Sequence, residues 1–174
     1  MNKTMVAMTV AASLIAAAHA PAQGTLNDGH VLALFDEANT ADIWTARLAM
    51  AKSQSAEVRK LATMVIADHE AVQHMARELA KKLGMIVTPP AGDESAGALA
   101  AAIKELQSKS SAEFDRAYIA HELSFHRSAI DAIKGTLLPA ATNREVKALL
   151  ENVLNGFEHH LQETRRVADA IGVR

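Results

Sequence analysis

The stretch TNREVKALLENVLNGFEHHLQETRRVADAI, residues 142–171, decides the fold. Apolar side chains recur in it every three or four positions, as expected for one buried face of a long amphipathic helix. These residues are Val146, Leu150, Val153, Phe157, Leu161, Val167 and Ile171. Thr142 and Glu145 have the spacing of a capping box, so we expect the helix to begin there.

Three further helical patterns precede this stretch, over about residues 28–52, from Ser53 or Ser55 to Leu83, and from Ser111 to Gly135 or Leu137. The second is expected to bury Val58, Leu61, Val65, Val72, Met75, Leu79 and Leu83. Short connections at 53–55 and 138–141 predict two antiparallel helix pairs. The connection at 85–110 is long enough to cross a bundle and contains a weaker helical stretch. We therefore predict an all-α, ferritin-like four-helix bundle, residues 23–174, with a long crossover between its second and third helices.

The amino-acid composition excludes several classes of function. The 174 residues contain no cysteine, which excludes disulfides, thiolate metal sites and thiol catalysis. The formal net charge is −2, so we expect no nucleic-acid partner. The sequence has neither a Gly-x-Ser-x-Gly motif nor a glycine-rich phosphate loop, and serine hydrolase and nucleotide-binding functions are not supported.

Residues 1–22 have the form of a signal peptide. Lys3 gives a basic start, residues 5–18 are apolar, and small residues follow at Ala18, Ala20 and Ala22. We predict cleavage after Ala22 and a periplasmic or secreted protein. The alternative is an uncleaved membrane anchor, but the apolar run is shorter than the ~20 residues of a membrane span. We expect no transmembrane segment in the mature chain.

Ionisable residues interrupt the apolar stripes of all four predicted helices. Burying such groups without partners costs several kcal/mol each, so we expect them to pair with one another, with water or with a metal ion. The candidate metal ligands are Asp42, Asp68, His69, Glu122, His126 and His160. Asp68 is either a ligand or a partner that orients one. His121 and His159 are alternates if the helix phase differs.

The depth of these residues along the bundle depends on the topology. With a crossover, the second and third helices run in parallel, and Asp42, His69, Glu122, His126 and His160 fall within roughly 6 Å of one level. In a plain up-down-up-down bundle, His126 and His160 are separated by roughly 10 Å. A shared site therefore requires the crossover.

These observations support two functions from different classes. The first is a protein that binds a transition metal, for which zinc or copper suits a histidine-rich set better than iron. The alternative is a metal-free structural or interaction protein of the cell envelope, related to stress. A di-iron or di-manganese enzyme is not supported, because the chain has no Glu-x-x-His motif. A homodimer is compatible with such a bundle.

The chain resembles a bacterial family known as domain of unknown function 4142 (DUF4142) and described as ferritin-like. The similar stretches are residues 35–50, Met64-Val-Ile-Ala-Asp68-His69, Phe114-Asp-Arg-Ala-Tyr118 with His126, and His160-Leu161. The family typically has Glu where this chain has Asp42, whose side chain is shorter. The resemblance implies the fold and export, and it implies no established activity.

Overall fold

The computed structural model describes residues 26–173, which form helices and no strand. The four long helices are α2 (Asp28–Lys52), α3 (Ala56–Lys82), α5 (Ser111–Ala132) and α7 (Arg144–Ile171). A shorter helix, α4 (Ser95–Gln107), precedes α5. The all-α prediction is confirmed, whereas the predicted signal peptide lies outside the described residues. None of the helices within residues 26–173 combines the length and apolarity needed to span a membrane.

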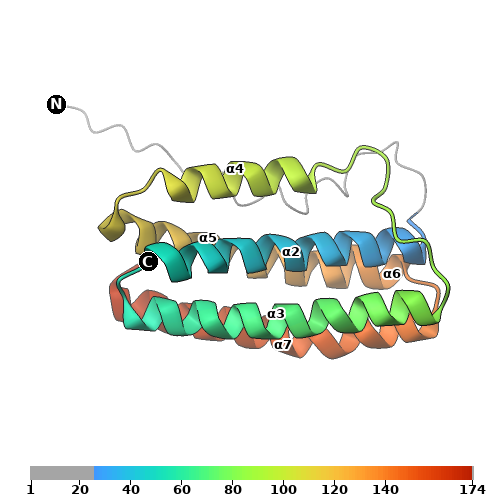
Figure 1. The fold of residues 1–174 in the computed structure, drawn as a ribbon. Helices are drawn as coiled ribbons and strands as arrows, with labels where there is room; N and C mark the ends of the chain where they lie inside the picture. The colour runs from blue at the N-terminus through green and yellow to red at the C-terminus, as the bar shows by residue number, and fades with distance from the viewer. Residues whose placement is uncertain (1–25, 174) are drawn as a thin grey trace.

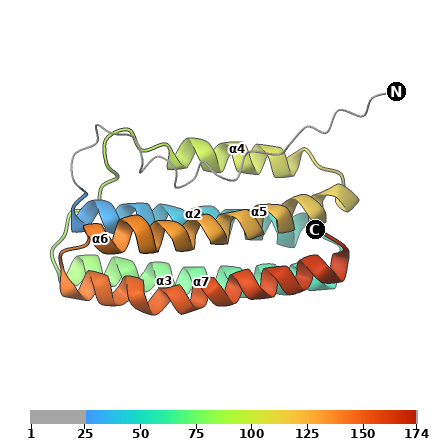
Figure 2. The ribbon, with the colours of Figure 1, turned by 180° about the vertical axis from the view of Figure 1, so that it is seen from behind.

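The four long helices form a bundle, and α4 lies on its outside (Figures 1 and 2). In the bundle α2 packs against α3 and α5, and α7 packs against the same two helices. The short helix α4 packs against α2 and α5 and carries the chain back along the bundle, so α3 and α5 run in the same direction (Figure 1). The predicted long crossover is therefore present.

Polar side chains fix the starts of three long helices. Asn27 accepts a hydrogen bond from the backbone N–H of His30 at 2.9 Å, and Ser55 accepts one from Val58 at 3.4 Å. The predicted start of α7 at Thr142 is wrong by one residue, since Asn143 is the cap and accepts from Glu145 N–H at 2.8 Å. The backbone N–H of Thr142 instead donates to Asp28 at 2.8 Å, which ties the start of α7 to that of α2.

The end of the third long helix was predicted too early. Helix α5 continues as a π-helical turn, η2 (Ile133–Leu137), and as one further turn, α6 (Leu138–Ala140). Pro139 lies in the first turn of α6, directly after the π-helical turn. The connection to α7 is therefore only residues 141–143 rather than 138–141.

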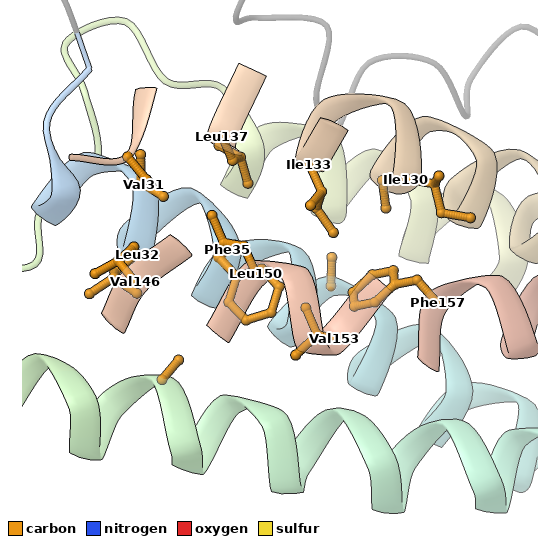
Figure 3. Close-up of a cluster of buried hydrophobic side chains, with 14 of the residues drawn as sticks. Val31, Leu32, Phe35, Ile130, Ile133, Leu137, Val146, Leu150, Val153 and Phe157 are labelled. Atoms are coloured by element: carbon orange, nitrogen blue, oxygen red, sulfur yellow. The ribbon is translucent and has the colours of Figure 1, made fainter. Parts of the chain in front are cut away.

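The core consists of two apolar clusters. One contains the residues labelled in Figure 3, among them Phe35 from α2, Ile130 from α5 and Leu150 from α7. The other contains Val65 from α3 and Ile119 from α5. On each long helix the residues between the two clusters include buried polar side chains. A polar layer therefore divides the core, and all four helices contribute to it.

The predicted buried stripe of α3 is wrong at Met75, which is 50% exposed. After His69 the buried face continues through Gln73, Ala76 and Ala80 instead. Small alanine side chains let a helix approach its neighbours closely, so the helix turns this face inward. The thioether of Met75 is left on the surface.

The connection that leads into α4 contacts α2 near Glu37, and this contact makes stability depend on pH. Burial and the negative charge of Asp93 raise the pKa of Glu37 from 4.5 to about 7. An acid with a raised folded-state pKa contributes stability that is present below pH 4.5 and is lost as the pH rises through 7. We therefore expect Glu37→Gln to reduce the stability lost between pH 5 and pH 8.

Urea unfolding at pH 5 and pH 8 checks this prediction. The wild type should lose more stability over that interval than Glu37→Gln does. Asp131→Asn, an exposed carboxylate on α5, is a control for the loss of one carboxylate elsewhere in the bundle. Equal losses in wild type and Glu37→Gln would show that Glu37 releases its proton at an ordinary pH.

Candidate metal centre

Each of the four long helices places one ionisable side chain in the polar layer. These are Asp42 on α2, His69 on α3, His126 on α5 and His160 on α7, and none is more than 3% exposed. The three histidines each offer a ring nitrogen to one group whose atoms all lie within 4.8 Å of one another. We call these four residues the HHHD cluster. Its members are separated by up to 118 positions in the sequence.

The carboxylate of Asp42 lies beside two of the rings. Its Oδ2 atom is 2.9 Å from Nε2 of His69 and 3.4 Å from Nε2 of His126. Nε2 of His69 is also 3.1 Å from Nδ1 of His160. Within residues 26–173, however, neither carboxylate oxygen of Asp42 nor Nε2 of His126 has a hydrogen-bond partner. Buried polar atoms of this kind are rare in proteins and point to a further ligand.

Hydrogen bonds fix which nitrogen of His69 carries the proton. The side-chain amide of Asn39 donates to the carbonyl oxygen of Phe35 at 2.6 Å, so its oxygen faces His69. Nδ1 of His69 lies 2.9 Å from that oxygen and must be the donor. A neutral imidazole has only one N–H, so Nε2 presents a lone pair to the inside of the cluster.

The other two rings are oriented in the same way. Nδ1 of His126 lies 3.0 Å from the backbone carbonyl of Glu122, and Nε2 of His160 lies 2.9 Å from a carboxylate oxygen of Asp68. Both partners accept hydrogen bonds, so the outer nitrogen of each ring is the N–H donor. The lone pairs at Nε2 of His126 and Nδ1 of His160 therefore point inward. This pattern, with the outer N–H held by an oxygen acceptor, is typical of metal-bound histidines.

Burial sets the charges of the cluster. Burial alone would raise the pKa of Asp42, but the neighbouring His69 and His126 outweigh it and hold that pKa below its usual value. Burial lowers the pKa of His126 to about 4, with Asp42 acting in the opposite direction. Burial also lowers the pKa of His160, against the opposing effect of the hydrogen bond that this ring donates to Asp68. At neutral pH a charged carboxylate thus accompanies two uncharged imidazoles, those of His126 and His160, and these are protonation states that bind cations.

Glu122 and Asp68, the two remaining candidate ligands, flank the cluster at different depths. Glu122 is fully buried, and its carboxyl lies 3.8 Å from Nδ1 of His126 and accepts from Thr45 Oγ1 at 3.4 Å. Burial, with the nearby charge of Asp42, raises the pKa of Glu122 well above its usual value. Glu122, Asp42 and His126 also offer ligand atoms within 4.8 Å of one another.

The side chain of Asp68, by contrast, is 55% exposed and contacts the cluster through His160. The position of Asp68 fits the role of an orienting partner. The two alternates lie elsewhere: His121 is buried but outside this group, and His159 is exposed.

Sequence reasoning missed Asn39, which holds His69 and is fully buried. The signal available in the sequence was its position three residues before Asp42, on the same helix face. An asparagine is common on helix surfaces as well as inside, so this spacing alone does not distinguish an inward amide from a solvated one.

The fold and the cluster together define an all-α helical-bundle protein with a buried histidine–carboxylate group suited to a metal ion. A family model described as Domain of unknown function (DUF4142) matches residues 13–167, and the chain belongs to this family. No curated protein and no solved structure matches the chain in the comparisons made. The ferritin-like relationship therefore stays a prediction.

Proposed function

We propose that this protein is an exported metal-binding protein whose HHHD cluster coordinates one transition-metal ion, zinc or copper(II). The supporting observation is the direction of the ring nitrogens. Three outer nitrogens are held by oxygen acceptors, and three inner lone pairs converge beside the charged carboxylate of Asp42. Electron-rich atoms buried this close together repel one another unless a cation lies among them.

The distances suit a four-coordinate ion. Ligands about 2.0–2.2 Å from zinc at tetrahedral angles are roughly 3.3 Å apart. Three of the six donor pairs here are 2.9, 3.1 and 3.4 Å apart. Asp42 does not share one group of ligand atoms within 4.8 Å with all three histidines, so its carboxylate must shift toward them to admit an ion. Nitrogen and carboxylate donors without sulfur favour zinc and copper(II) over copper(I).

The donor set favours binding over catalysis. Catalytic zinc sites usually have three protein ligands and keep a fourth position for water or substrate, whereas structural sites are closed by four. In this proposal the three histidines and Asp42 supply the four ligands once the Asp42 carboxylate shifts toward the histidine group, with Glu122 beside them as a neutral group. We propose that the protein stores, carries or is stabilised by the ion, in an envelope compartment reached through the signal peptide at residues 1–22.

A metal-free envelope protein is the competing function. It requires a proton on one inner nitrogen, which would convert the Asp42–His69 contact into a buried ion pair. The geometry favours this less, because the outer nitrogens of all three rings are already held by oxygen acceptors, so a further inner proton would make one buried ring a cation.

Metal analysis of protein purified without a histidine tag tests the proposal. Mass spectrometry of the eluted protein and calorimetric titration of the stripped protein with Zn²⁺ and Cu²⁺ should both give about one ion per chain. Protein that contains no metal and binds none on titration would refute the proposed function.

A further inference from the structure

A groove between α3 and α7 leads to the HHHD cluster. It has a volume of about 320 Å³, and Asp68, His69, Met75, Gly156, Phe157 and His160 are among its lining residues. His69 and His160 are cluster members, so the groove reaches the proposed metal ligands. The other two members, Asp42 and His126, are fully buried and do not line it.

The groove is kept open where α7 has a glycine. Gly156 is exposed, and a Cβ atom added to it would meet no described atom within 4 Å. A glycine inside a helix costs about 1 kcal/mol relative to alanine. At this position glycine leaves open the wall of a groove that leads to buried ligands.

Asp68 lies at the rim of the groove and bonds to the cluster. Its side chain is 55% exposed and accepts from Nε2 of His160, which is itself nearly buried. An exposed carboxylate at the mouth of a partly apolar groove attracts cations from solvent. The same carboxylate holds the outer nitrogen of His160, so a cation that binds Asp68 competes with that hydrogen bond and loosens the ring.

We infer that the groove is the route by which a divalent cation enters and leaves the HHHD cluster. Asp68 is the first ligand that the ion meets, and His160 is the side chain that turns to pass it inward. The inference rests on the proposed function and adds a kinetic role for His160 and for two further residues, Asp68 and Gly156. Neither of these residues belongs to the four inner donors.

Filling the groove should change rates without changing affinity. We expect Gly156→Leu to slow both binding and release of Co²⁺ by on the order of tenfold, because groove residues must move before the ion can pass. The dissociation constant should stay within about twofold, since none of the inner donors is altered. Leucine is a better helix former than glycine, so the variant should fold.

Asp68→Asn tests the other half of the inference. The amide oxygen can still accept from His160, but the negative charge is lost. We expect slower binding of Co²⁺ and a weaker dependence of the binding rate on salt, because screening acts on the attraction between charges. Asn155→Leu, exposed and next to Gly156 but outside the groove lining, is the control and should bind at the wild-type rate.

Stopped-flow absorbance of the Co²⁺ complex on tag-free protein measures these rates, with the equilibrium constant taken from titration. If Gly156→Leu binds and releases Co²⁺ more slowly than wild type by the same factor, the groove is supported as the route of the ion. If wild type binds Co²⁺ and Gly156→Leu does so at the same rate, the route is wrong and the metal site stands. If wild type binds neither Co²⁺ nor Zn²⁺, the proposed function fails and the route fails with it.

Discussion

His126→Ala should lower the affinity of the protein for Zn²⁺ by on the order of 1000-fold, since even the loss of a group that only orients a ligand costs 10–100-fold. The ring of His126 is fully buried, and its inner nitrogen faces Asp42. Removing it leaves three donors and a cavity that water can enter. Competition with a chelator of known affinity measures the change.

His159→Ala is the matched control for this substitution. His159 is exposed on α7 next to His160 and lies outside the cluster. Replacing His159 should leave the affinity for Zn²⁺ within about twofold of the wild-type value. If His126→Ala retains wild-type affinity while His159→Ala loses it, the protein binds metal on its surface and not in the bundle.

Asp42→Asn should lower stability modestly in the metal-free protein and much more in the presence of metal. In the metal-free protein the buried carboxylate of Asp42 lies 2.9 Å from Nε2 of His69 and 3.4 Å from Nε2 of His126. Because His69 and His126 hold the pKa of Asp42 below its usual value, the charge stabilises the folded protein, and neutralising it should modestly lower the free energy of unfolding. In excess Zn²⁺ the wild type should gain about 4 kcal/mol at 1000 times the dissociation constant, and the variant much less.

Urea unfolding with and without Zn²⁺ measures both effects. Glu122→Gln is the comparison variant, because Glu122 is already neutral by our assignment and its amide should change neither curve by much. A loss of about 3–5 kcal/mol in metal-free Asp42→Asn would identify a buried ion pair. That result would favour the structural protein over the metal-binding one.

The sequence predicted the bundle well because its signals were periodic and long. Four amphipathic stretches, two short connections and one long one left few topologies, and the crossover followed from the length of residues 85–110. The same topology placed His69, His126 and His160 at one level before any coordinates were considered. Their levels follow from helical rise alone, which is why this part of the prediction was successful.

The sequence-based predictions that were wrong concern features that depend on packing between helices. Met75 was expected inside because it is large and apolar, yet α3 buries Ala76 and Ala80 instead. Pro139 was read as the middle of a linker, although it lies in the first turn of α6. In each case the outcome depends on neighbours contributed by another helix, and a single sequence does not contain that information.

The hydrogen bonds of the cluster were also beyond sequence reasoning. Asn39 hydrogen-bonds to His69, and Asp68 hydrogen-bonds to His160. Both bonds depend on the directions of side chains from two different helices. The same is true of the groove, which exists because Gly156 faces the half-exposed Asp68 and Met75 across the α3–α7 contact. The spacing of residues along a single helix does not predict any of these contacts.

Anomalous diffraction from a crystal of the tag-free protein soaked in Zn²⁺ tests the central claim most directly. We predict one strong peak inside the bundle, bound by Nε2 of His69, Nε2 of His126, Nδ1 of His160 and the carboxylate of Asp42. A map with no peak among these atoms, or with peaks only at exposed histidines such as His159, would contradict the assignment of a buried metal centre.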